Sequence, residues 1–317
     1  MCTALVLGHF FGRTLDLEYS YQEQVVVVPR QFPLSFRMVD EISTHHTIIG
    51  MAHVEQNYPL FYDGINEKGL AMAALNFPLS AVYHGTQKGQ TNLTPFELIP
   101  WVLGQCSSVA QAKQLLEQVN VIGVDFSPRL PSTPLHWLVA DRDQSITVEP
   151  MADGLHIHEN PAGVLTNEPS FPFQLSRLND FRGLSAAPAP NRFPSLPLTE
   201  YSRGMGALGL PGDWSSRSRF VRCAFAAHNS VRPVDVTEFF HIMSTVEVPR
   251  GSVRLENGKE VISVYTSCCD LTGGVYHYTT YENRQISAVD LHRCDLEGDA
   301  LSCYPLVTRP QIALQNG

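Results

Sequence analysis

The chain begins MCTALVLGHFFGRTLD, residues 1–16. Initiator Met is removed when the next side chain is small, and Cys2 meets that condition. Its removal would leave one residue that carries both a thiol and a free α-amine. The reference pKa is about 7.7 to 8.0 for an α-amine and about 8.5 for a free cysteine, so the amine is a suitable base for the thiol. The start of the chain therefore predicts an N-terminal nucleophile at Cys2.

The residues that follow support this interpretation. Met-Cys alone is a weak signal, because a free cysteine is commonly a small buried hydrophobic residue. Here Cys2 runs directly into an apolar strand pattern, which predicts that the chain end is held in the core instead of fraying. Arg13 and Asp16 then follow, three residues apart. A guanidinium beside a thiol favours the thiolate, and a carboxylate can hold the α-amine in position.

Composition and charge argue against several other classes of protein. The 317 residues include 31 Asp plus Glu against 22 Lys plus Arg, a net charge of −9. Nucleic acid is therefore not expected as a partner, because its phosphate backbone requires a basic surface. Apolar runs fall short of the roughly 18 to 20 residues that span a bilayer, and the first residues lack the basic segment of a signal peptide, so we expect a cytoplasmic protein. The seven cysteines are odd in number and without CxxC spacing, which indicates neither a disulfide framework nor a zinc site.

Hydrophobic periodicity predicts a β-rich protein with a few helices. We expect strands at residues 3–7, 10–13, 24–29, 47–54, 70–75, 135–140, 145–150, 155–158, 261–266, 274–281 and 285–291. Capping signals predict helices that start at Thr94, Ser108 and Asp235. Asp153-Gly154 predicts a hairpin, while residues 64–69 and the Pro-, Ala- and Ser-rich stretch 184–197 are typical of loops. Two adjacent helices followed by strands favour a layered α+β protein over an alternating βαβ sheet.

Two further patterns do not indicate sites. GMGALG (204–209) matches a dinucleotide fingerprint, but it follows a Pro-rich excursion instead of a strand, and Pro211 blocks the expected helix. His136, His156 and His158 could suggest a metal, yet the last two alternate on a predicted hairpin strand without a third ligand, which favours structural or surface roles.

Nine short strings along the chain are weak singly and specific as an ordered set: MCT (1–3), FGRTLDLEYS (11–20), NEKGL (66–70), LNFP (75–78), LHW (135–137), GVLTN (163–167), GLPGD (209–213), SRFVR (218–222) and YTSCC (265–269). In this set the chain resembles the choloylglycine hydrolases, which comprise bile salt hydrolases and penicillin V acylases. The resemblance implies the N-terminal-nucleophile hydrolase fold, a four-layer αββα sandwich of two stacked, mainly antiparallel sheets flanked by helices, formed by residues 1–317 as one domain. The first hairpin turn, around Gly8-His9, is shorter than is usual in the family.

Carried over residue by residue, the resemblance implies six catalytic residues: Cys2, Arg13, Asp16, Asn76, Asn167 and Arg219. Asn76 and Asn167 would contribute to an oxyanion site, for which side-chain or backbone N–H donors are suitable. Taken without the resemblance, both asparagines read as turn residues and Arg219 as a surface charge.

The implied reaction is hydrolysis of the amide bond between a bile acid and glycine or taurine, by a cytoplasmic bacterial homotetramer that needs no metal or organic cofactor. Four apolar residues, Leu15, Tyr21, Phe126 and Leu130, are candidate walls for the steroid, although ordinary core positions would look the same. Penicillin V is the alternative substrate; Asn76 favours bile salts, because penicillin-preferring relatives often carry Tyr there. An inactive protein that sequesters amphipathic ligands is the alternative of a different class, and the intact catalytic set argues against it.

Overall fold

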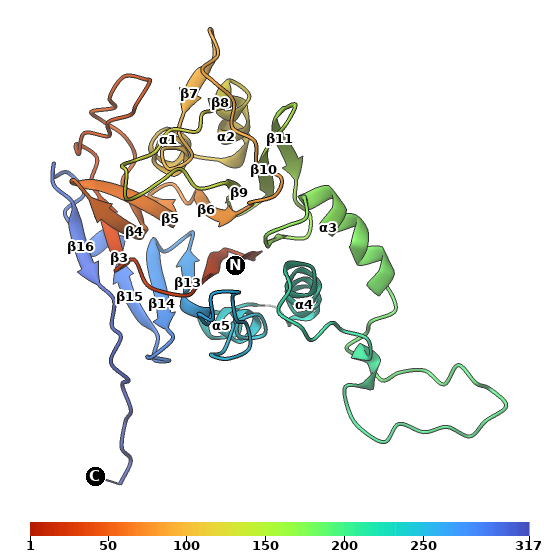
Figure 1. The fold of residues 1–317 in the computed structure, drawn as a ribbon. Coiled ribbons are helices and arrows are strands. Elements are labelled where there is room, and N and C mark those ends of the chain that lie inside the picture. Colours follow the sequence, from red (N-terminus) through yellow and green to blue (C-terminus); the bar gives the residue numbers. More distant parts are fainter. Residues whose placement is uncertain (232, 317) are drawn as a thin grey trace.

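Two β-sheets lie face to face in the computed structural model, which describes residues 1–231 and 233–316 (Figure 1). Within these residues one sheet has six strands in the order β12-β1-β2-β13-β14-β15, and the other has eight in the order β11-β10-β9-β6-β5-β4-β3-β16. Neighbouring strands in both sheets are antiparallel, while the separate pair β7 and β8 is parallel.

The strands of the six-stranded sheet are β1 (Cys2–Leu7), β2 (Phe10–Leu17), β12 (Val164–Leu165), β13 (Ile262–Asp270), β14 (Val275–Thr280) and β15 (Ser287–Asp290). Those of the eight-stranded sheet are β3 (Gln24–Val28), β4 (Ile48–Glu55), β5 (Tyr58–Asn66), β6 (Ala71–Asn76), β9 (Leu135–Ala140), β10 (Ser145–Met151), β11 (Gly154–Glu159) and β16 (Ser302–Pro305). The parallel pair consists of β7 (Thr91–Leu93) and β8 (Val119–Val121).

The helices are α1 (Leu98–Gln105), α2 (Val109–Leu116), α3 (Phe171–Arg177), α4 (Ser216–Asn229) and α5 (Val236–Ser244), with 3-10 turns η1 (Leu178–Phe181), η2 (Met205–Ala207) and η3 (Leu291–Arg293). α1 and α2 cover the eight-stranded sheet, and α4 and α5 cover the six-stranded sheet (Figure 1). One apolar core joins both sheets to α4 and α5, and a second lies between the eight-stranded sheet and the other helix pair. The predicted αββα sandwich is confirmed. Among the described residues, no helix combines the length and the hydrophobicity needed to cross a membrane.

The β1–β2 hairpin places the N-terminus in the middle of this sandwich (Figure 1). Its two-residue turn is Gly8-His9, and Gly8 has a φ of 65°, a conformation that glycine adopts without the steric cost of a side chain. The resulting register pairs Cys2 with Leu15 and Thr3 with Thr14. Since side chains alternate along a strand, Cys2 shares one face of the sheet with Arg13 and Leu15, and Asp16 lies on the other face.

The predicted elements and the structure differ in several places. α1 begins at Leu98, after a turn over residues 95–97, and the predicted capping contact is present: the Glu97 carboxylate accepts from the backbone N–H of Thr94 and also from that of Arg37 in a distant loop. β5 was not predicted, and Gly64, expected in a loop, is one of its residues. α4, also not predicted as a helix, carries the SRFVR string. The helices starting after Ser108 and Asp235, both of which cap through their side chains, and the Asp153-Gly154 hairpin are confirmed.

Candidate active site

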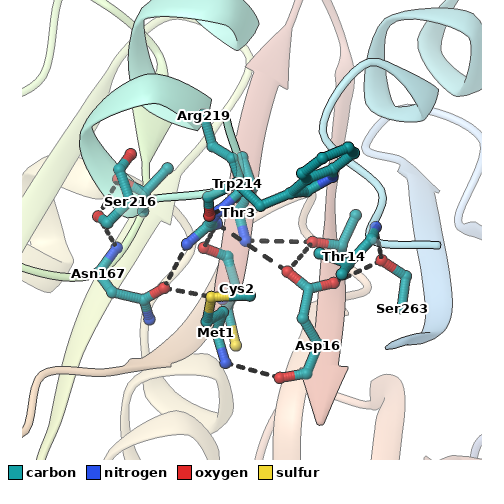
Figure 2. A network of polar contacts seen from close by, with 12 residues as sticks. Met1, Cys2, Thr3, Thr14, Asp16, Asn167, Trp214, Ser216, Arg219 and Ser263 are labelled. Atoms are coloured by element: carbon teal, nitrogen blue, oxygen red, sulfur yellow. Dashed lines mark hydrogen bonds and ion pairs between the residues drawn. The ribbon is translucent and has the colours of Figure 1, made fainter. Parts of the chain in front are cut away.

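Cys2 lies at the first position of β1 and is 2% exposed. Its sulfur accepts a hydrogen bond from Nη2 of Arg13, at 2.5 Å. Its backbone nitrogen donates to Oδ1 of Asn167 at 2.9 Å. The sulfur and the nitrogen of one residue thus have separate polar partners, which come from β2 and from the segment after β12. Figure 2 shows Cys2 beside Asn167.

Arg13 is held in place by two central strands of the opposite sheet, β5 and β6. Its guanidinium donates to the carbonyl oxygens of Tyr62, at 3.1 Å, and Ala74, and Nε donates to the carbonyl of Thr14. Burial lowers the pKa of Arg13, but Cys2 and buried acidic groups around it outweigh that effect and raise it, so the side chain stays a cation. A fixed positive charge beside the Cys2 sulfur favours the thiolate.

On the other face of β1 and β2, Asp16 forms a buried polar cluster with α4. Its carboxylate accepts from Ser263 Oγ at 2.6 Å and from Thr14 Oγ1 at 3.1 Å, and lies 3.9 Å from Nη1 of Arg219. Burial raises the pKa of Asp16, and Arg219 opposes that rise. The Asp16 carboxylate contacts the arginine and the hydroxyls, whereas the nitrogen of Cys2 bonds Asn167.

Arg219 extends from α4 to the backbone of β1 and is fully buried. Its guanidinium donates to the Cys2 carbonyl, to Thr3 Oγ1 at 2.6 Å and to Asn167 Oδ1 at 2.8 Å, and Nε donates to the Trp214 carbonyl at 3.0 Å. Burial lowers the pKa of Arg219, and the nearby Asp16 opposes this effect. Figure 2 shows the arginine joining Cys2, Asn167 and the Asp16 cluster.

Asn167 and Asn76 are joined directly, because Nδ2 of Asn167 donates to the carbonyl of Asn76 at 2.8 Å. Pairing of β6 with β5 ends at Ala73, whereas its pairing with β9 continues to Asn76. The carbonyls of Ala74 and Asn76 therefore have no β5 partner and accept from the side chains of Arg13 and Asn167 instead. One N–H of the Asn167 amide is used in this contact, and a second one remains on the same nitrogen.

Met1 extends the hairpin by one residue. Its α-amine donates to the Asp16 carbonyl at 2.6 Å, and its own carbonyl accepts from the Asp16 N–H at 3.0 Å (Figure 2). With Met1 present, the nitrogen of Cys2 belongs to a peptide bond and has no lone pair available as a base.

A cavity of about 240 Å³ opens beside Cys2 and Arg13, and Asn76 also lines it. Each of the four predicted wall residues contributes to this lining: Leu15, Tyr21, Phe126 and Leu130. Further apolar lining that sequence reasoning missed comes from Leu17, Leu60, Phe61, Phe96 and Leu135. The structure thus brings the candidate nucleophile to an apolar pocket.

Comparison with known proteins identifies the family of this site. The family of linear amide C–N hydrolases named choloylglycine hydrolases matches residues 2–304. The chain belongs to the choloylglycine hydrolase family. A bile salt hydrolase/transferase of Lactiplantibacillus plantarum is 47% identical over 100% of both chains. The structure of a C2A mutant of conjugated bile acid hydrolase from Clostridium perfringens is 36% identical, with a TM-score of 0.94 and complete coverage of both chains.

A protein with lower sequence identity shares the fold of this choloylglycine hydrolase family member. A penicillin V acylase from Agrobacterium tumefaciens has a TM-score of 0.75 at 20% identity, over 96% of this chain and 90% of the other. This likeness shows the shared sandwich architecture. The enzyme class, hydrolysis of linear amide C–N bonds, follows from the family itself.

Proposed function

We propose that the protein hydrolyses the amide bond that joins a bile acid to glycine or taurine, with Cys2 as the nucleophile. The observation that carries the proposal is the position of Cys2: its sulfur contacts Arg13 beside an apolar pocket, and its nitrogen is bonded to Asn167. The relatives named as bile salt or conjugated bile acid hydrolases support this choice of substrate.

The chemistry follows from the contacts around Cys2. After Met1 is removed, the α-amine takes the thiol proton and the sulfur attacks the amide carbonyl carbon. The carbonyl π electrons move to oxygen, and the second N–H of Asn167 and the backbone N–H of Asn76 stabilise the oxyanion. The C–N bond then breaks, and the leaving amine takes the proton from the α-ammonium. The α-amine of Cys2 then deprotonates a water molecule, which attacks the thioester. The products are the free acid and the restored thiol of Cys2.

The buried arginines have different parts in this mechanism. Arg13 would stabilise the thiolate, since its cation lies against the sulfur. Arg219 would orient Cys2 and Asn167, because it bonds the carbonyl of the first and Oδ1 of the second. Asp16 would balance the buried charge of Arg219, whose guanidinium holds the Cys2 carbonyl.

The steroid would occupy the pocket lined by Leu15, Tyr21, Phe126 and Leu130, whose apolar surface suits a rigid hydrocarbon skeleton. Penicillin V remains the second candidate, because the same thioester chemistry serves any acyl group that fits. Incubating the purified protein with glycocholate, taurocholate and penicillin V in parallel tests the proposal. Release of glycine or taurine supports it, and cleavage of penicillin V alone would contradict it. Binding of all three without cleavage would favour the inactive ligand-binding protein.

We expect the active protein to lack Met1. A retained Met1 places the nitrogen of Cys2 in a peptide bond, which removes the proposed base while leaving the thiol in place. Intact-mass measurement and N-terminal sequencing should show Cys2 as the first residue in active preparations. A fusion protein with an uncleavable extension before Cys2 should be folded and inactive. Full activity in a preparation that retains Met1 would refute the role of the α-amine.

We also propose that the chain acts as one domain and assembles as a homotetramer. The excursion between η1 and α4 projects from the sandwich (Figure 1) and exposes apolar side chains, with Phe193 63% and Tyr201 86% exposed. Apolar exposure of this kind is typical of protein interfaces. Sedimentation velocity should give a tetramer, and Phe193→Ser with Tyr201→Ser should shift it to smaller species. A parent protein that sediments as a monomer would contradict the proposal.

A cytoplasmic location in bacteria completes the proposal. All seven cysteines are free thiols. That state is normal in a reducing compartment.

A further inference from the structure

His136 lies in β9 with no exposed surface, next to both segments that carry the candidate oxyanion residues. Its ring stacks on Phe77, the residue after Asn76, with centroids 4.2 Å apart and planes 7° from parallel. Its Nε2 lies 2.8 Å from the carbonyl oxygen of Thr166, the residue before Asn167. One imidazole therefore contacts the chain neighbours of both asparagines.

The hydrogen-bond partners of His136 determine where its protons lie. A carbonyl oxygen only accepts, so Nε2 carries a hydrogen and donates to Thr166. Nδ1 lies 3.2 Å from Oε1 of Glu149, which is also buried and accepts from the N–H of Phe171 at 2.9 Å. One proton lies between Nδ1 and Oε1 in either protonation state of the pair. It is on Nδ1 if the pair is an imidazolium and a carboxylate, and on Oε1 if both groups are neutral. Glu149 thus keeps the imidazole oriented with Nε2 toward Thr166.

Glu168 joins the same two segments independently. Its carboxylate accepts from the N–H of Leu79 at 2.8 Å, the N–H of Ser80 at 2.9 Å and the Ser80 hydroxyl at 2.8 Å. The two segments that carry the asparagines are therefore joined by two further contacts, one through His136 and one through Glu168. An oxyanion site requires such support, because its donors must be fixed before charge develops on the substrate.

We propose that His136 is a positioning residue that fixes the separation of Asn76 and Asn167, and hence the geometry of the oxyanion site. This inference rests on the proposed function, in which those two residues stabilise the oxyanion. It assigns the histidine no contact with the substrate. The imidazole acts through Phe77 on one segment and through the Thr166 carbonyl on the other.

The test compares two reactions of Cys2 in the double variant His136→Phe, Glu149→Gln. Phenylalanine retains the stacking on Phe77 and loses the bond to Thr166, and glutamine avoids leaving a buried carboxylate without its partner. Hydrolysis of glycocholate passes through an oxyanion, so kcat should fall by about 10- to 100-fold. This loss is smaller than the 10²- to 10³-fold typical of a removed donor, because both asparagines are still present and only their positions change. Alkylation of Cys2 by iodoacetamide forms no oxyanion, so its rate constant should stay within about twofold of the parent value.

The control variant is His45→Phe. His45 is also buried and its ring nitrogens lie against the carbonyls of His46 and Phe32, but it packs near α1, away from the asparagines. Its loss should lower the melting temperature without a change in kcat. If the double variant does not fold, His136→Gln is measured by the same criteria, because it loses the stacking on Phe77 and leaves an amide as a partner for the Glu149 carboxylate. A folded variant with unchanged kcat overturns the proposal, as does a parallel fall in kcat and alkylation rate.

Assays of the parent protein distinguish a failure of this inference from a failure of the proposed function. If the parent cleaves penicillin V and no bile salt, the proposed substrate is wrong, and the comparison is made with penicillin V because the oxyanion forms in either reaction. If the parent cleaves its substrate and the double variant is equally active, the proposed function stands and the role of His136 is refuted.

Discussion

Replacing Cys2 by serine is expected to leave a folded protein in which amide hydrolysis has fallen by about 10³-fold or more, since a hydroxyl is a far weaker nucleophile than a thiol at neutral pH. Folding should survive because serine fits the space of cysteine, and the backbone contacts of Cys2 with Asn167 and Arg219 do not involve the sulfur. The measurement is kcat/KM for glycocholate beside a thermal melt. Cys303→Ser, at an exposed thiol, is the matched control and should retain full activity.

Chemical modification gives an independent check of the same prediction. Burial raises the pKa of Cys106 to about 11 and that of Cys223 to about 12, so both remain protonated and unreactive near neutral pH. Iodoacetamide should therefore label Cys2 first, and activity should fall in step with that label. Labelling of Cys106 or Cys294 in step with the loss of activity would contradict the assignment of the nucleophile, as would a Cys2→Ser protein with near-parental turnover.

The part of the site that was predictable from sequence alone is the part fixed by short-range pairing. A two-residue turn at Gly8-His9 determines the register of the hairpin, and that register places Arg13 on the same face as Cys2. The same register pairs Thr3 with Thr14 on the opposite face of the sheet. These two residues of the polar cluster around Asp16 could therefore have been predicted as well. Ser263 could not, because it enters from a strand that is remote in sequence and has no distinctive local pattern.

The burial of charged residues could not be predicted from the local sequence pattern. Asp63, with Pro59 and Gly64 in the same segment, is typical of a loop, and β5 was missed for that reason. In the structure Asp63 is buried because two tyrosine hydroxyls, of Tyr265 and Tyr276, bond its carboxylate at 2.6 Å from strands about two hundred residues away. Arg219 is similar: only the resemblance to a family distinguished it from a surface charge, and its acceptors lie on β1 and at Asn167.

The position of Asn167 suggests more than one contribution to catalysis. Its Oδ1 accepts from the nitrogen of Cys2 and from Arg219, while its Nδ2 donates to the Asn76 carbonyl and keeps a second hydrogen. Asn167→Ala removes all of these contacts at once. We expect kcat to fall by about 10²- to 10³-fold, the usual cost of losing one oxyanion donor, with a much smaller change in KM.

Two further variants separate the oxyanion contact from the structural contacts of the same side chain. Asn167→Asp keeps an acceptor for Cys2 and Arg219 but has no N–H, so it should lose turnover about as much as the alanine variant. Asn76→Ala keeps its backbone N–H and should be milder. If both asparagines were turn residues only, their loss would destabilise the fold by about 0.5 to 3 kcal/mol without a specific effect on turnover. Thermal melts beside steady-state kinetics therefore decide the role: a lowered melting temperature with unchanged kcat in Asn167→Ala, or an active Asn167→Asp, would rule out donation from this amide, because neither variant retains the N–H that the oxyanion requires.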